Sequence, residues 1–258
     1  MTASTLQEAT VLLEARTRTD YDIPPKWAWG SVASYVIWTA IPIIVYLDRG
    51  RSGTQLAIPL GILGLAGFLS STLSSYLVYR LVNRRNTHFA REEAFLWKTL
   101  DTVKSKTPQT DMRTLLPLSS AEQGLAQLSE TGREHSAILW ALLTLIPYIG
   151  WVAMIYVLAF LSNDIRKHEL REDLVLEDLG RVLKTQGGQD LPMRQRRVPN
   201  RSIPLHVLLS IATLCVFLLV WLYQLVKDPQ AHFEYHRSFE EVLPGFQLGT
   251  GQSVGGPA

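Results

Sequence analysis

The sequence lacks the cysteines on which cross-linked and metal–sulfur proteins depend. Its 258 residues include one cysteine, Cys215, so a disulfide framework and a cysteine-rich metal site are both excluded. An excess of charge of one sign is missing too: the formal net charge is +2, which gives no argument for nucleic-acid binding. Cys215 lies in an apolar run, where we expect a small residue that faces lipid or another helix.

Motifs of established enzymes are absent as well. The chain contains no GxSxG, GxxxxGK[ST] or GxGxxG pattern. Residues 1–18 hold no apolar core of signal-peptide length, so we expect the first apolar segment to act as an uncleaved anchor. On this basis we expect no catalytic residue and no cofactor.

Long apolar runs are what the sequence does have. A bilayer core of about 30 Å needs roughly 20 apolar residues in a helix. Four uncharged segments meet this requirement: 27–47, 54–79, 136–161 and 203–226. Charged, helix-forming stretches (80–135 and 162–202) and two tails (1–26 and 227–258) surround them. The sequence therefore predicts an all-α integral membrane protein with about four transmembrane helices and long amphipathic helices outside the bilayer.

The third segment contains a candidate break at Pro147-Tyr148-Ile149-Gly150. Its length favours a full span, whereas a re-entrant segment improves the charge asymmetry. Four spans divide the 25 basic residues 14 to 11, and a re-entrant third segment divides them 21 to 4. Because basic residues mark the cytoplasmic side, both versions place the N-terminus in the cytoplasm. The predicted location is the cell membrane, with multiple passes.

Small residues recur at helical spacing in the second segment. They are Gly61, Gly64, Gly67, Ser71 and Ser75. Such a row allows close approach of a neighbouring helix, so we predict helix packing here. The alternative is that glycine is simply frequent in membrane helices.

Apolar stripes mark the charged stretches. Val82, Phe89, Leu96 and Val103 recur every seven residues after the second segment, and Phe233 follows the fourth. Such a stripe packs against a helix, a partner or the bilayer surface. We interpret these residues as a surface for a partner or the membrane, and Arg84, Arg85 and Arg91 as contacts for anionic headgroups.

Helix starts are indicated at three places. Ser119-x-x-Glu122 and Thr5-x-x-Glu8 read as capping boxes, and Asp228-Pro229 reads as an N-cap followed by a first-turn proline.

A repeated element follows the membrane segments. YRLVNRRNTHFAREEAF (79–95) and YQLVKDPQAHFEYHRSF (223–239) share six identities at a constant offset of 144 residues. A fainter copy follows the third segment. The repeat places His88, His168 and His232 at equivalent positions.

The stretch Lys227-Asp228-Pro229-Gln230-Ala231-His232-Phe233 is similar to a Lys-Asp-Pro-Asn-x-His-Phe motif in a family of uncharacterised prokaryotic multi-pass membrane proteins. Residues 83–89 resemble a companion motif. Since that family has no assigned activity, the resemblance implies a fold and no function.

Two interpretations of the repeated histidines remain open. His88, His168 and His232 either converge on a metal, since neutral imidazole is a common ligand, or pack at the starts of their helices. The adjacent carboxylates Glu92-Glu93, Glu172-Asp173 and Glu240-Glu241 read as solvated helix faces, because neighbours on a helix point apart. The basic cluster at 194–197 reads as topogenic.

The function expected from these patterns is that of a non-enzymatic membrane scaffold or accessory subunit. Its partners would be the bilayer and other membrane subunits or a second copy, with no nucleic acid. The first alternative is a transporter or channel component, which would need a water-filled cavity lined by Ser70, Ser74, Thr39 and Thr144. The second alternative is a membrane enzyme with a histidine-based metal site, which would need at least two of the repeated histidines within ligand reach of each other.

Overall fold

The computed structural model describes residues 11, 14–47, 53–107, 111–188, 190–192 and 198–247. These residues contain helices and no strand, which confirms the all-α prediction. The helices are α2 (Lys26–Leu47), α3 (Gly53–Lys106), α4 (Met112–Thr131), α5 (Ala137–Leu145), α6 (Ile149–Thr185), α7 (Ile203–Ala212) and α8 (Phe217–Gln247). Three of the described helices, α2, α3 and α6, are long and apolar enough to cross a membrane.

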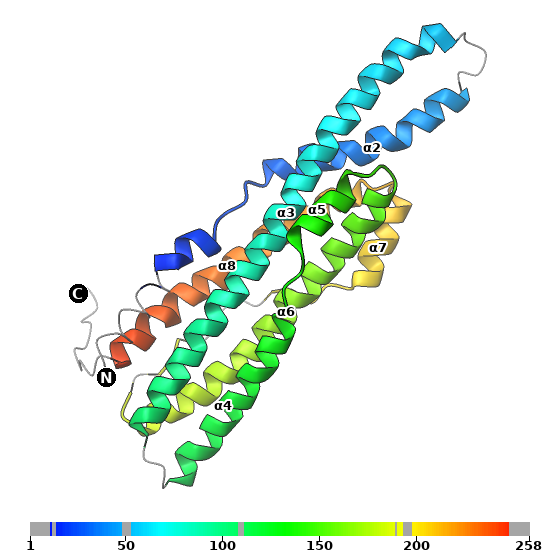
Figure 1. Ribbon diagram of the computed structural model, residues 1–258. Coiled ribbons are helices and arrows are strands. Elements are labelled where there is room, and N and C mark those ends of the chain that lie inside the picture. The colour runs from blue at the N-terminus through cyan, green and yellow to red at the C-terminus, as the bar shows by residue number, and fades with distance from the viewer. Residues whose placement is uncertain are drawn as a thin grey trace, which may run out of the picture.

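The apolar helices pair as three antiparallel hairpins, α2/α3, α5/α6 and α7/α8 (Figure 1). Contacts between aromatic rings show the pairing. The ring centres of Trp27 on α2 and Tyr76 on α3 are 5.2 Å apart, and those of Trp140 on α5 and Tyr156 on α6 are 4.8 Å apart. The ring centres of His206 on α7 and Trp221 on α8 are 5.1 Å apart. In each hairpin the second helix runs on without interruption into the charged half of the molecule.

Two of the hairpins are short. At 1.5 Å per residue, the 22 residues of α2 extend about 33 Å, whereas the 9 of α5 and 10 of α7 extend about 14–15 Å. The break predicted at Pro147 is confirmed: α5 ends at Leu145, and Tyr148 turns the chain with φ 64°.

The turn in the fourth segment was not predicted, and a single helix over 203–226 is wrong. α7 ends at Ala212, and Leu214 and Cys215 adopt positive φ. The Thr213 hydroxyl accepts a hydrogen bond from the backbone N–H of Phe217 at 2.9 Å, which caps the start of α8. No proline or glycine marks this turn in the sequence.

Polar contacts tie the open ends of the three hairpins together at one level. Tyr21 Oη donates to the Arg80 carbonyl at 2.7 Å, and Arg85 pairs with Asp164 at 2.8 Å. The Trp221 indole donates to Ser162 Oγ at 2.9 Å. Apolar hairpins therefore project from one end of the molecule, and the charged helical bundle from the other (Figure 1).

Two of the predicted helix starts lie inside helices. Asp228 and Pro229 are within α8, where Pro229 has no N–H for the carbonyl of Leu225. The Arg84 guanidinium donates to that carbonyl at 3.2 Å, which satisfies the acceptor that proline leaves free. Ser119 lies inside α4, whose N-cap is Asp111. The Thr5-x-x-Glu8 box and the basic cluster at 194–197 lie outside the described residues.

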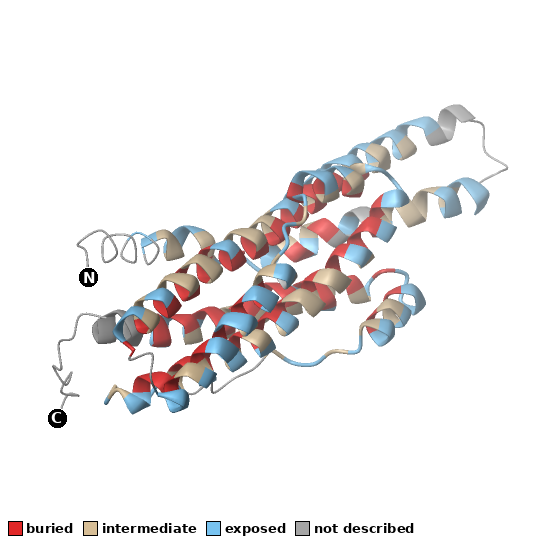
Figure 2. Ribbon diagram, turned by 60° about the horizontal axis from the view of Figure 1, so that its bottom comes forward, coloured by how far each residue is buried: buried red, intermediate tan, exposed pale blue. Residues whose placement is uncertain are grey.

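The apolar stripe of the charged half faces inward. Buried residues line the inner faces of the helices (Figure 2). The predicted stripe residues are at most 6% exposed: Val82, Phe89, Leu96, Val103 and Phe233. Leu96 and Val103 belong to a core with residues of α4, α6 and α8. The interpretation of the stripe as a surface for a partner or the membrane is wrong, because these side chains pack within the chain.

Candidate functional site

Three long helices carry titratable side chains to one buried place between the cores of the hairpins and of the bundle. On α3, α6 and α8, a histidine precedes a glutamate or a second histidine by four residues, so both side chains lie on one helix face. We call the following residues the His/Glu cluster: His88, Glu92, His168, Glu172, His232 and His236. All six are at most 2% exposed.

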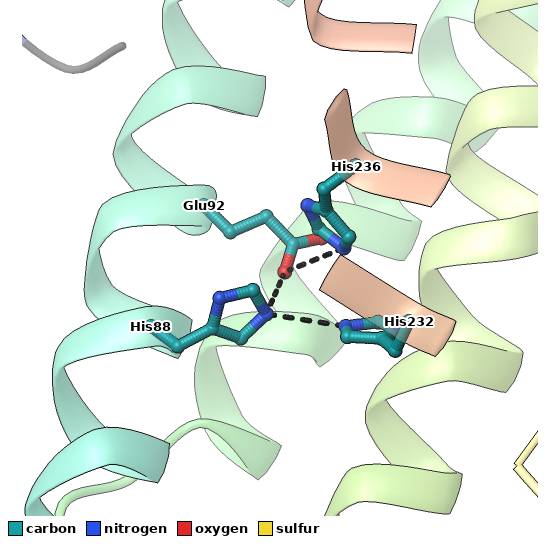
Figure 3. Close-up of side chains that lie close together, drawn as sticks. All are labelled: His88, Glu92, His232 and His236. Atoms are coloured by element: carbon teal, nitrogen blue, oxygen red, sulfur yellow. Dashed lines mark hydrogen bonds and ion pairs between the residues drawn. The ribbon is translucent and has the colours of Figure 1, made fainter. Parts of the chain in front are cut away.

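Glu92 lies at the centre of this cluster. Its Oε2 is 2.5 Å from Nε2 of His168, 3.4 Å from Nε2 of His88 and 3.6 Å from Nε2 of His236. Figure 3 shows how His88 and His236 approach Glu92 from two helices, with His232 beside His88. The two Nε2 atoms of His88 and His232 are 3.1 Å apart. Imidazole nitrogens from three helices therefore surround one carboxylate.

The cluster contains two overlapping groups of ligand atoms. His88, Glu92, His232 and His236 form one group, and Glu92, His168, Glu172 and His232 form the other. Within each group the ligand atoms all lie within 4.8 Å of one another. Because Glu92 and His232 belong to both groups, the two positions are adjacent.

An outer layer of charged residues orients the histidines. His88 Nδ1 donates to Asp20 Oδ1 at 2.8 Å, which leaves Nε2 directed at the cluster. His236 Nδ1 lies 3.5 Å from Glu240 Oε1. Arg91 joins both carboxylates, at 3.0 Å from Asp20 and 2.7 Å from Glu240. Imidazoles held from behind by carboxylates are typical of metal ligands.

The electrostatics of the cluster favour a positive charge. Burial lowers the pKa of His236, but the Glu172 and Glu92 carboxylates outweigh it and raise that pKa to about 10. Burial raises the pKa of Glu240, but His236 and Arg91 lower it by more, so the net shift of this pKa is downward. In the absence of a metal, His236 therefore holds a proton at neutral pH, in a place where carboxylates stabilise any cation.

Several buried polar atoms of the cluster have no hydrogen-bond partner among the described residues, Oε1 of Glu92 and Nδ1 of His168 among them. The two ring nitrogens of His236 also form no hydrogen bond, but they lie within ion-pair distance of Glu172 and Glu240, at 3.2 Å and 3.5 Å. A buried polar atom without a partner costs about 1–3 kcal/mol, so such atoms are uncommon in the interior of a protein. On Glu92, the unpaired oxygen belongs to the residue that both groups share.

The predicted histidines His88, His168 and His232 thus lie together, although they are far apart in the sequence. The interpretation of the paired carboxylates as solvated is wrong for Glu92, Glu172 and Glu240, which are 0% exposed. Sequence reasoning missed Glu92, Glu172 and His236 as candidate ligands. The signal that would have found them is the spacing of four residues after each repeated histidine.

The arginines expected at headgroups are also buried. Arg84, Arg85 and Arg91 are at most 5% exposed, because each extends inward to carbonyls or carboxylates of other segments. The prediction of a headgroup surface is therefore wrong for these three.

The row of small residues on α3 falls into two parts. A Cβ on Gly67 would lie 3.1 Å from the Trp38 ring of α2, and Ser71 Oγ accepts from the Trp38 indole at 3.1 Å. Ser75 Oγ donates to the carbonyl of Ala141 on α5 at 2.7 Å. A Cβ on Gly61 or Gly64 would meet nothing within 4 Å.

The comparisons with known proteins give no independent indication. No known family, curated protein or solved structure matches this chain. The function of this chain must therefore be inferred from the geometry of the described residues.

Proposed function

We propose that this chain is a membrane-anchored metalloenzyme that binds two transition-metal ions in the His/Glu cluster. The observation that carries the proposal is the convergence of six buried ligand residues from three helices on two adjacent positions. The condition set for a metal-dependent enzyme is met, since His88 and His232 lie within ligand reach of each other at 3.1 Å.

The spacing of the cluster fits metal ions. Nitrogen and oxygen ligands lie about 2.0–2.2 Å from an ion, so two of them are at most about 4.4 Å apart. The observed limit of 4.8 Å requires shifts of only a few tenths of an ångström for each side chain. Glu92 supports a bridging role, because one of its oxygens contacts three histidines and the other has no partner.

The types of ligand also restrict which metal ions fit the cluster. Mixed imidazole and carboxylate ligands suit zinc, iron or manganese, whereas copper(I) and iron–sulfur clusters prefer thiolates. Such ions activate a bound water when a coordination position is open. A cavity of about 20 Å³ touches both His88 and His232, and this volume is enough for about one water molecule.

A membrane position for the site follows from the hairpins. Side chains on their outer faces are apolar and exposed, such as Ile62 (63%), Val152 (71%) and Ile211 (63%). We propose that α2 and α3 cross the bilayer and that the two short hairpins enter it from the same side and return. All but Arg49 and Arg51 of the 25 basic residues then share the cytoplasmic side with both termini and with the cluster.

Labelling of introduced cysteines in intact cells tests this topology. In a Cys215→Ser background, we expect Ser52→Cys to react with an impermeant maleimide added from outside. Glu177→Cys and Glu234→Cys, which lie on exposed positions of α6 and α8, should react only after permeabilisation. External labelling of Glu234→Cys would contradict the re-entrant α7/α8 hairpin.

The observations that motivated the other functions do not favour them. The stripe expected to hold a partner is buried within the chain. The hydroxyls expected to line a channel instead donate to backbone carbonyls: Ser70 to Gly30, Ser74 to Ser31, Thr39 to Tyr35 and Thr144 to Ala141. Neither feature supplies a reason to prefer a scaffold or a transporter.

Cobalt substitution tests the metal site. Protein treated with chelator and titrated with Co²⁺ should develop d–d absorption bands that saturate at two equivalents, one for each group of ligands. Glu92→Gln and His236→Ala should lose most of this absorption. His135→Ala is the matched control, because His135 lies outside the cluster. Equal absorption in wild type and Glu92→Gln would refute the proposal.

A further inference from the structure

Two neighbouring cavities lie between the open ends of the hairpins and the His/Glu cluster. The smaller one, of about 20 Å³, lies among α3, α6 and α8 and reaches His88 and His232. The larger one, of about 250 Å³, lies among α6, residues 198–204 and α8. Ile165 and Leu225 line both cavities, so these two side chains separate them. A ligand in the larger cavity is therefore one side-chain layer from the cluster.

Two of the four arginines that line these cavities lack acidic partners. Arg84 lines the smaller cavity, is 3% exposed, donates to backbone carbonyls and lies 5.6 Å from the centre of the Phe233 ring. Arg166 lines the larger cavity and donates to the amide oxygen of Asn200. In the described part of the chain, no carboxylate lies within ion-pair distance of either guanidinium.

The other two arginines differ from these. Arg85 lines the smaller cavity and is paired with Asp164, and Arg201 lines the larger one and is paired with Asp228. A buried cation without a counter-ion is costly, and Arg84 is such a cation. The two cavities therefore have an excess of positive charge that an acidic group of a ligand would neutralise.

Apart from its arginines and histidines, the smaller cavity has an apolar lining, whereas Ser162, Asn163, Ser202 and Asp228 add polar groups to the larger one. Leu81, Leu161 and Phe233 line the smaller cavity, and Ile203 and Pro204 line the larger one at the start of α7. From there, α7 exposes Leu205 (50%) and Leu208 (62%) on the hairpin surface. The larger cavity is smaller than the roughly 300–1,000 Å³ typical of sites for drug-sized ligands, so it accommodates a headgroup and not a chain.

We propose that the ligand delivered to the metal centre is an anionic amphiphile from the bilayer, a lipid with an acidic headgroup. Its headgroup enters the larger cavity beside Arg166. Ile165 and Leu225 must move aside for its acidic group to reach Arg84, next to His88, because the smaller cavity holds only about one water molecule. Its apolar chain stays along α7 in the bilayer. This assignment rests on the proposed function, because it names the substrate class of that same site.

Lipid binding to detergent-purified, metal-loaded protein tests the assignment. The probe is radiolabelled dioleoyl phosphatidic acid, with dioleoyl phosphatidylcholine as the neutral comparison. We expect the acidic lipid to bind at least about tenfold more tightly, as one or two charge-assisted hydrogen bonds supply. Equal affinity for the two lipids would overturn the assignment. Effective competition by soluble glycerol phosphate would overturn the requirement for a chain.

Arginine variants locate the binding site. Arg84→Gln and Arg166→Gln should each weaken phosphatidic acid binding about tenfold with metal content unchanged. Arg181→Gln is the matched control, because this arginine is exposed on α6 far along the bundle. If Arg84→Gln fails to fold, because Arg84 satisfies the Leu225 carbonyl, Arg166→Gln and the cavity-filling Ile165→Trp decide the question. Wild-type binding by these two variants would overturn the assignment.

Metal analysis of the same samples separates the two proposals. A wild-type protein that holds two metal equivalents but does not discriminate between the lipids refutes only the ligand assignment. A protein that holds no metal refutes the proposed function, whichever lipid it binds.

Discussion

The hairpins and the bundle differ in the kinds of polar side chain that they bury. In the hairpins the outer faces are apolar, and most buried polar residues are small hydroxyl side chains that donate to nearby carbonyls, such as Ser74 and Ser75. In the bundle, exposed charges occupy the outer face, and the interior contains histidines and carboxylates. This difference is the one expected if the hydroxyl groups serve packing and the His/Glu cluster serves the proposed metal binding.

The two regions also differ in what is left over inside. A serine hydroxyl that donates to a carbonyl needs no further partner. The cluster around Glu92 has an unpaired carboxylate oxygen and more carboxylates than the arginines beside it neutralise. Buried negative charge of this kind requires a cation, which is the protonated His236 when no metal is bound.

Removal of the metal should have the largest effect. A ligand present at 1,000 times its Kd stabilises the native state by about 4 kcal/mol. Chelation should therefore lower the thermal midpoint of the bundle strongly, and added Zn²⁺ or Mn²⁺ should restore it. Circular dichroism at 222 nm during heating measures the effect. Glu92→Gln, which should hold less than half of the metal, should respond much more weakly to chelator.

Loss of a core leucine should affect the bundle much more than the hairpins. Leu179→Ala removes a side chain that is 0% exposed in the bundle core, and we expect a loss of roughly 3 kcal/mol. Leu65→Ala removes one that is 62% exposed on the hairpin face, where little packing is lost. Denaturant unfolding in detergent compares the two. Equal losses would contradict the assignment of Leu65 to a lipid-facing surface.

The outer carboxylate Asp20 predicts a pH dependence. Burial raises its pKa, but the hydrogen bond and charge of His88 and the charge of Arg91 lower it to about 2 from 3.8. A depressed pKa means that Asp20 stabilises the fold above pH 4, by about 2 kcal/mol, and that this stabilisation is lost as pH falls through about 2. Asp20→Asn should therefore be less stable than wild type at pH 6. The difference should disappear near pH 2.

The smallest effect compares two glycines of α3. Gly67→Leu brings a large side chain against Trp38, and we expect roughly 1–2 kcal/mol of destabilisation from overpacking. Gly61→Leu enters open space and should be neutral or slightly stabilising, since leucine favours helix over glycine. A thermal-shift measurement in detergent decides. A larger destabilisation by Gly61→Leu than by Gly67→Leu would contradict the position of the α2/α3 contact at Gly67.

The same contrast explains what the sequence could predict. Apolar composition located the first segment at 27–47, within one residue of α2, and Pro147 located the turn between α5 and α6. The turn at residues 213–216 had no such marker, because Thr213 forms it through a side-chain hydrogen bond. A periodic stripe predicted that Val82 and Leu96 would be covered, but not that this chain would cover them.

The site was only half predictable for a similar reason. The repeat drew attention to His88, His168 and His232, whereas Glu92 and Glu172 resembled ordinary charges on helix surfaces. On a single helix, a histidine and a glutamate four residues apart are a common solvated pair. Only the packing of α3, α6 and α8 turns three such faces toward one another.

The metal content of the purified protein shows whether the His/Glu cluster binds two ions. Inductively coupled plasma mass spectrometry of wild type, purified in mild detergent without chelator, should find close to two equivalents of zinc, iron or manganese per chain. Glu92→Gln should retain less than half of that. Wild-type protein that is folded and free of transition metal, and that stays so after incubation with each of the three ions, would contradict the account.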